Sequence, residues 1–139
     1  MREGRLLMPN LKQTVLRQLV DIRFADATAL LNTKTPQRRN AAMYMAGYGV
    51  ECALKTLICV TRGQDHLEPQ FFHHNLWGLA ESTSRWSVLS AAGPWRDRLV
   101  FIQGEWEVAM RYGVRSYDPK QVLKFITKAK EFTLWLLES

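Results

Sequence analysis

The sequence lacks the patterns on which most assignments of enzymes and metal sites depend. It contains no Cys-x-x-Cys or His-Glu-x-x-His pattern, no Gly-x-Ser-x-Gly turn, and no glycine-rich phosphate loop. His66, His73 and His74 fall in one short segment, but the adjacent His73 and His74 would point apart on regular structure. We therefore expect no metal site and no cofactor, and no motif identifies a reaction.

Long apolar runs are also absent. Arg and Lys interrupt every candidate for the stretch of about 20 apolar residues that a membrane span needs. The beginning of the chain has only Leu6-Leu7-Met8 after its basic residues, which is too short for a signal peptide core. We expect a cytoplasmic protein without membrane contact, in which residues 1–9 form a flexible segment.

Cysteine is scarce, with Cys52 and Cys59 as its two occurrences. On one helix their α-carbons would lie about 10 Å apart, from the rise per residue. A disulfide needs about 7 Å or less. The sequence therefore predicts two reduced, buried thiols.

The composition is that of an ordinary folded domain. The chain has 139 residues, of which 47% are hydrophobic and 23% charged, and its net charge is +6. A positive charge of this size favours encounter with RNA, DNA or acidic proteins, but it does not identify a reaction.

Helical spacing of apolar residues runs through the whole chain, and no Asn-Gly or Asp-Gly hairpin signal occurs. The pattern predicts an all-α fold, an up-and-down bundle of about four main helices plus short helical pieces, as one domain over residues 1–139. We expect the main helices at about 11–31, 37–61, 95–112 and from 119 onward, with a short helix from about 74.

Capping residues mark several of these boundaries. Asn10 is the expected cap of the first helix, and Gly63 is the expected stop after the second. Asp118 followed by Pro119 is the clearest helix start in the chain.

Two helices have a pattern that predicts which side is buried. The first carries apolar residues at Val15, Leu16, Leu19, Ile22, Phe24, Ala27, Leu30 and Leu31. The last carries one apolar stripe of Val122, Phe125, Ile126, Ala129, Phe132, Thr133 and Leu136, opposite Lys120, Lys124 and Lys128.

Residues 41–55 form the most informative segment. Small residues, among them Gly47 and Gly49, alternate with tyrosines in an apolar helix. The glycines predict either close helix–helix contact or room for a ligand or a partner subunit's backbone. Glu51 and Lys55 stand one turn apart, in the favourable order for a helical ion pair.

The basic residues near the end of the chain permit two interpretations. Lys120, Lys124 and Lys128 form either a solvated helix face or, with nearby arginines, a face that binds phosphate. Arg111 follows an apolar helix and precedes Tyr112, so it should pair with an acid or bind an anion. We nominate Glu51 as that acid.

Three motifs, in order, resemble the HEPN domain family. They are the segment 43–55, with the run AGYGVECALK, then His74-Asn75-Leu76, and then Trp106 followed by Arg111-Tyr112. The resemblance implies an up-and-down helical bundle, commonly a homodimer, in prokaryotic cells. Members work beside a nucleotidyltransferase or in toxin–antitoxin and defence systems, and some are metal-independent ribonucleases.

The ribonuclease members resemble one another in an arginine followed, after four to six residues, by a histidine. Here the positions after Arg111 are Ser116, Tyr117 and Asp118. The leading hypothesis is therefore a homodimeric binding module for a nucleotide, RNA or a nucleotidyltransferase-type partner, rather than an enzyme. The alternatives are a metal-independent ribonuclease that uses Arg111 with His74, and a purely structural dimeric bundle.

The candidate binding residues have assigned roles. Arg111 and Lys55 would contact phosphate or an acid, Glu51 would orient Arg111, and His74 with Asn75 would shape the rim. Tyr112 completes the set of Glu51, Lys55, His74, Asn75, Arg111 and Tyr112.

Overall fold

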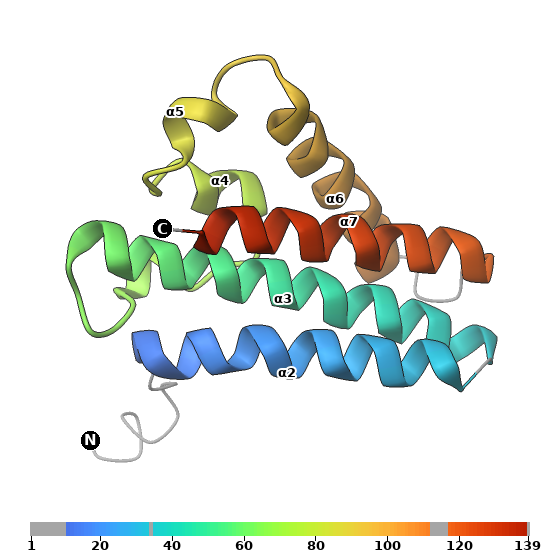
Figure 1. The fold of residues 1–139 in the computed structure, drawn as a ribbon. Helices are drawn as coiled ribbons and strands as arrows, with labels where there is room; N and C mark the ends of the chain where they lie inside the picture. Colours follow the sequence, from blue (N-terminus) through green and yellow to red (C-terminus); the bar gives the residue numbers. More distant parts are fainter. Residues whose placement is uncertain (1–10, 34, 112–116, 139) are drawn as a thin grey trace.

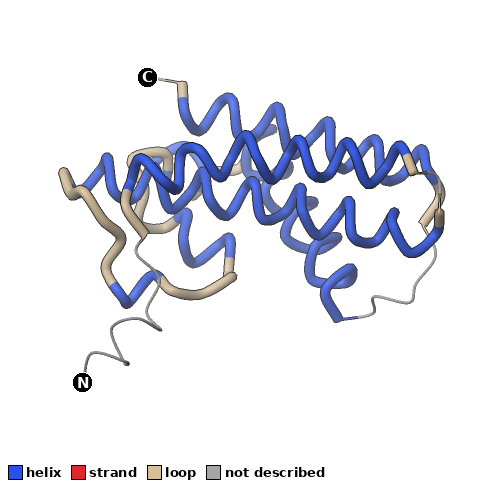
Figure 2. Tube along the Cα trace, turned by 90° about the horizontal axis from the view of Figure 1, so that it is seen from below, coloured by secondary structure: helices blue, strands red, loops and turns tan. Residues whose placement is uncertain are grey.

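The computed structural model describes residues 11–33, 35–111 and 117–138, without the side chains of residues 36 and 108–111. The described part is an all-α bundle with four long helices (Figure 1). These are α2 (Gln13–Asn32), α3 (Pro36–Arg62), α6 (Pro94–Arg111) and α7 (Pro119–Leu137), with α4 (Leu76–Ala80), α5 (Trp86–Leu89) and the 3-10 turn η1 (Pro69–Phe71) between α3 and α6. No strand occurs among these residues (Figure 2).

Helix α3 is the centre of the bundle. It packs against α2 along its length, against α7 on another side, and against α4 and α6. Figure 1 shows α2, α3 and α7 side by side, with α6 crossing them obliquely and α4 and α5 beyond. Residues 33–35 separate α2 from α3, within the break that the sequence predicts at 32–36, and the two helices form a helical hairpin.

The predicted face of the last helix is confirmed. Val122, Phe125, Ile126, Ala129, Phe132, Thr133 and Leu136 are all buried. Asp118 caps α7, accepting a hydrogen bond from the Lys120 backbone N–H at 2.7 Å, while Gln121 Oε1 accepts one from the backbone N–H of Asp118. The reciprocal pair fixes the start of α7 where the sequence places it.

The first helix differs from its prediction. Leu16, Val20, Phe24 and Ala27 form its buried stripe. Val15 and Ile22, which were expected on that face, are exposed, because they lie beside the stripe rather than on it. The short helix also starts later than expected, at Leu76, so His74 lies in the loop before it.

The start of α2 is fixed by backbone pairing. Asn10 lies outside the described residues, and Lys12 occupies the cap position without a side-chain hydrogen bond. The backbone N–H of Gln13 donates to Asp65 O at 2.6 Å, and that of Leu67 donates to Leu11 O at 2.9 Å. The segment that follows α3 is thereby held against the first residues of α2.

The two central glycines face the protein's own core. A methyl group on Gly47 would collide with the indole of Trp106, and one on Gly49 would lie 2.6 Å from the ring of Phe24. The indole Nε1 of Trp106 donates to Tyr44 O at 3.1 Å. Of the two interpretations of these glycines, close packing between helices is the one that the structure supports.

Candidate functional site

Helix α3 carries an ion pair inside the bundle. The Nζ of Lys55 lies 2.9 Å from Oε2 of Glu51, and the two side chains are only 7% and 5% exposed. Both residues lie on the part of α3 where every residue from Val50 to Cys59 is buried. Removal of one partner would leave a charge without compensation in a poorly solvated environment.

His74 brings a third titratable group to this pair. Its Nδ1 lies 2.7 Å from Oε1 of Glu51, so each oxygen of the carboxylate has its own partner. An ionised carboxylate only accepts hydrogen bonds, so Nδ1 carries the hydrogen and Nε2 is the remaining ring nitrogen. The imidazole is 58% exposed, whereas the carboxylate that orients it is buried.

The loop before α4 explains the position of His74. Asn75 caps α4, with Oδ1 accepting from the Gly78 backbone N–H at 3.1 Å. The backbone N–H of Asn75 donates to Nδ1 of His73 at 3.2 Å. These two hydrogen bonds hold the backbone around His74 in place. They also give Asn75 a structural role as the cap of α4.

Two tyrosines extend the cluster along α3. The hydroxyls of Tyr44 and Tyr48 are hydrogen bonded at 3.0 Å, and the Tyr48 ring meets the His74 ring edge to face with centroids 5.9 Å apart. The hydrogen bond with Tyr44, with burial and the charge of Glu51, raises the pKa of Tyr48 well above its ordinary value. Tyr48 therefore stays neutral through the physiological range.

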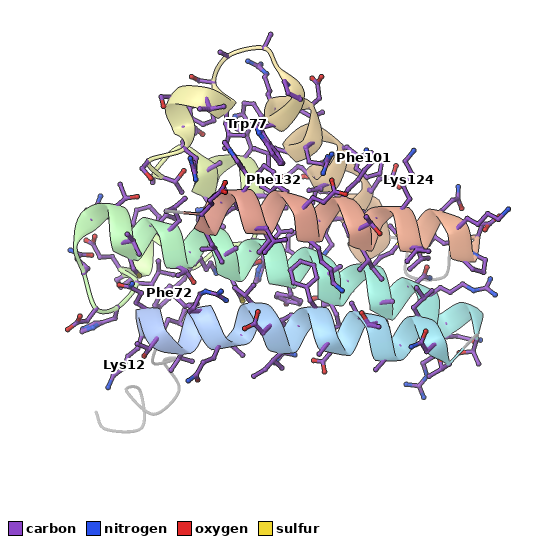
Figure 3. The ribbon with its side chains drawn as sticks, in the orientation of Figure 1. Lys12, Phe72, Trp77, Phe101, Lys124 and Phe132 are labelled. Carbon is purple, nitrogen blue, oxygen red and sulfur yellow. The ribbon has the colours of Figure 1, made fainter. Side chains whose placement is uncertain are left out.

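The cluster lies at a cavity of about 520 Å³ between α2, α3 and the loop before α4. Its walls are largely apolar and include Leu11, Leu16, Leu19, Met45, Cys52 and Phe72. Its polar residues are Arg23, Tyr48, Glu51, Lys55 and His74. Figure 3 labels Phe72 at the end of the molecule where α2 begins. An apolar cavity with a few converging polar groups is typical of a small-molecule site.

Cys52 is a wall residue rather than a nucleophile. Burial, with a contribution from the nearby Glu51 charge, raises its pKa to about 11. A thiol with a raised pKa holds little thiolate at neutral pH. Cys52 and Cys59 are both free and buried, which confirms the prediction of two reduced thiols.

The structure thus gathers three of the six predicted residues, Glu51, Lys55 and His74, at one point. The side chain of Arg111 and all of Tyr112 lie outside the described residues, so the pairing of Glu51 with Arg111 stays a prediction. Sequence reasoning did not select Arg23 or Tyr48. An arginine inside an otherwise apolar helical segment was the available signal for Arg23.

In the ranges that the structure describes, no group of three or more His, Cys, Asp or Glu side chains is placed to hold a metal ion. None of the described helices has the length and apolar character to cross a membrane. The chain matches no protein-family model, no curated protein and no solved structure.

Proposed function

We propose that the protein is a HEPN-like binding module whose cavity engages a nucleotide, either free or as part of an RNA. The observation that carries this proposal is the buried Glu51 carboxylate, which holds an imidazole and an ammonium group together at the edge of an apolar cavity. The motif resemblance supports the same class of ligand.

The cavity suits a ligand with one flat apolar part and one anionic part. Its volume falls in the range of about 300–1,000 Å³ that small-molecule sites occupy. A base can contact Leu16, Leu19 and Phe72, which line the walls. Lys55 gives one of its three N–H groups to Glu51 and keeps the others for a phosphate oxygen, since its Nζ lies at the same cavity.

Arg23 adds a second cation to the same cavity. Its Nη1 is 3.2 Å from Asp26 Oδ2 and 3.8 Å from the sulfur of Met45, and Met45 is itself a wall residue. A guanidinium has five N–H donors, so these contacts leave others for a phosphate group.

The proposed assembly follows from the motif resemblance. It comprises a homodimer in the cytoplasm that works with a nucleotidyltransferase-type partner, in a toxin–antitoxin or defence system. Two free thiols suit a reducing compartment. Light scattering after gel filtration measures the molar mass and so tests the homodimer. Copurification with a nucleotidyltransferase-type protein tests the proposed partner.

Calorimetric titration with purine and pyrimidine nucleoside phosphates tests the cavity. We expect binding that weakens about tenfold or more in His74→Ala and in Arg111→Ala. His66→Ala is the matched control, because His66 is exposed and does not line the cavity. Equal affinity in wild type, His74→Ala and Arg111→Ala would exclude this site, and so would the absence of binding by every nucleotide.

A metal-independent ribonuclease is a second candidate, and the hydrogen bond between His74 and Glu51 is the observation that favours it. The carboxylate fixes the ring and its tautomer, so that Nε2 can exchange a proton with a substrate hydroxyl. Incubation with cellular RNA in EDTA decides between the candidates. Cleavage that His74→Ala abolishes and His66→Ala retains would establish the enzyme, whereas intact RNA leaves the binding module.

A further inference from the structure

A second feature lies on the face of α6 and α7, away from the cavity. Lys124 and Lys128, one turn apart on α7, both place their ammonium groups over the ring of Phe101 on α6, at 5.7 and 5.6 Å from its centroid. Figure 3 labels Phe101 and Lys124 beside each other where the two helices meet. We call Lys124, Lys128 and Phe101, together with Arg98, Trp95 and Trp135, the cation–aromatic strip.

The cation–aromatic strip continues along α6 and α7 through contacts between arginine and tryptophan side chains. Arg98 lies over the ring of Trp95 at 5.6 Å, and Trp95 stacks on Trp135 with centroids 4.6 Å apart and ring planes 8° from parallel. Arg85 from the segment before α5 lies over Trp135 at 4.8 Å. Trp95, Phe101 and Trp135 are half-buried, so part of each side chain is exposed to solvent beside the cation that lies over it.

The Phe101 ring orders the ammonium groups of Lys124 and Lys128 without neutralising their positive charge. An aromatic ring attracts an ammonium group but carries no net charge, whereas a carboxylate would cancel it. Within the described ranges, the ion pair on this face joins Arg98 to Glu131 at 3.0 Å, and no carboxylate pairs with Lys124 or Lys128. The strip therefore presents ordered cations to an anion.

We propose that the cation–aromatic strip binds single-stranded nucleic acid, with phosphates on Lys124 and Lys128 and bases against Trp95 and Trp135. Lysines four residues apart on a helix are about 6 Å apart along its axis, which is comparable to the spacing of consecutive phosphates in a strand. Cations beside exposed aromatic surface are the combination by which proteins bind single strands without reading sequence.

This inference goes beyond the cavity proposed above and does not depend on it. The residues of the strip and the residues that line the cavity have no member in common. A nucleotide in the cavity would contact Lys55 and His74, whereas a strand on this face would contact α6 and α7. Failure of one proposal therefore leaves the other standing.

Fluorescence anisotropy of a labelled short oligouridylate with the full-length protein tests the strip. The variant Lys124→Ala/Lys128→Ala is compared with Lys12→Ala/Lys130→Ala, which removes the same charge at exposed positions outside the strip. We expect the strip variant to bind about tenfold more weakly than the control variant at low salt. Loss of two phosphate contacts should also reduce the slope of log affinity against log salt by about 1.4.

Competitors and folding controls complete the experiment. A single strand should displace the probe better than inorganic polyphosphate or polyglutamate, because only the strand offers bases to Trp95 and Trp135. His66→Ala, which changes an exposed residue outside both the strip and the cavity, should bind the oligouridylate as wild type does. Circular dichroism melting should show both double variants folded, since Lys12, Lys124 and Lys130 are exposed and Lys128 is only half-buried.

Three outcomes would overturn the proposal. They are the absence of oligouridylate binding at low salt, equal losses in the two double variants, and displacement by polyphosphate or polyglutamate as effective as by the strand. The last result would assign the strip to polyanions or acidic proteins in general.

Discussion

The Nδ1 of His74 lies 2.7 Å from a carboxylate oxygen of Glu51, although the two residues are 23 positions apart in the sequence. The His74 ring is exposed and the Glu51 carboxylate is buried, so a group inside the bundle orients a ring on the surface. The other oxygen of the same carboxylate holds Lys55. Changes inside α3 should therefore affect both the stability of the bundle and the orientation of the His74 ring.

The first prediction concerns the buried pair. Glu51→Gln leaves the Lys55 ammonium in the bundle without its carboxylate, and we expect a loss of about 3–5 kcal/mol in the free energy of unfolding. Lys55→Met leaves Glu51 with only His74 and should also destabilise the protein. Urea denaturation followed by circular dichroism measures both values.

The double variant Glu51→Gln/Lys55→Met is the control for this prediction. With neither charge present, it should be more stable than the sum of the two single losses implies, by a coupling of about 1 kcal/mol or more. If the two losses simply add, the residues act independently and the ion pair has no net effect on stability. If Glu51→Gln also leaves nucleotide binding unchanged, the carboxylate does not orient His74 for a ligand.

The second prediction concerns the close contacts of α3. Gly47→Ala and Gly49→Ala should each destabilise the bundle by about 2 kcal/mol or more, because the added methyl group meets Trp106 or Phe24 inside a packed core. Thermal melting measures the change.

Gly104→Ala is the matched control for the glycines. It lies within α6 with nothing near the position of the new methyl group. Alanine there should stabilise the protein by about 0.5–1 kcal/mol, because it removes the entropy cost of glycine in a helix. Equal changes in stability for alanine at positions 47, 49 and 104 would show that Gly47 and Gly49 are not required for close helix packing.

The third prediction concerns the start of α7. Asp118→Ala removes the acceptor for the Lys120 N–H and should reduce the free energy of unfolding by about 1 kcal/mol. Asp118→Asn keeps a side-chain oxygen and should lose much less. Urea denaturation of both variants checks the difference, and a similar loss in both would show that charge rather than the hydrogen bond stabilises this helix start.

Local signals account for the parts of the fold that the sequence predicts. The α7 boundary follows from Asp118 and Pro119, and its buried stripe follows from helical spacing. Gly63 ends α3 in the left-handed conformation that glycine favours, with φ of 64°. These features depend on residues within one or two turns, which a sequence displays directly.

Contacts between residues far apart in the sequence determine the features of the fold and the site that the sequence does not predict. That Gly47 faces Trp106, and that Glu51 bonds His74, depends on how α3 meets α6 and the loop before α4. The exposure of Ile22 and the pairing of Leu11 with Leu67 also depend on tertiary packing. The sequence suggests Glu51 and Lys55 as a pair by their spacing, but nothing local places Arg23 at the same cavity.

The fourth prediction concerns stability at alkaline pH. Burial raises the pKa of Cys52 from 9.0 to about 11, so the unfolded chain loses this proton at lower pH than the folded protein does. Stability from the neutral thiol is fully present below about pH 9 and declines between about pH 9 and 11. The decline has a slope of up to about 1.4 kcal/mol per pH unit for this group, and it ends once the folded thiol also ionises. Tyr48, whose pKa is also raised, acts in the same direction at higher pH.

Cys52→Ala separates the thiol from the other groups that titrate in this range. The variant should be less stable than wild type at neutral pH, since it loses a buried sulfur atom, yet its stability should fall less steeply between pH 9 and 11. Urea denaturation in the presence of a reductant, repeated across this range, gives both slopes. Parallel pH profiles in the two proteins would show that Cys52 ionises alike in the folded and unfolded states, and that the wall of the cavity is more hydrated than its apolar side chains imply.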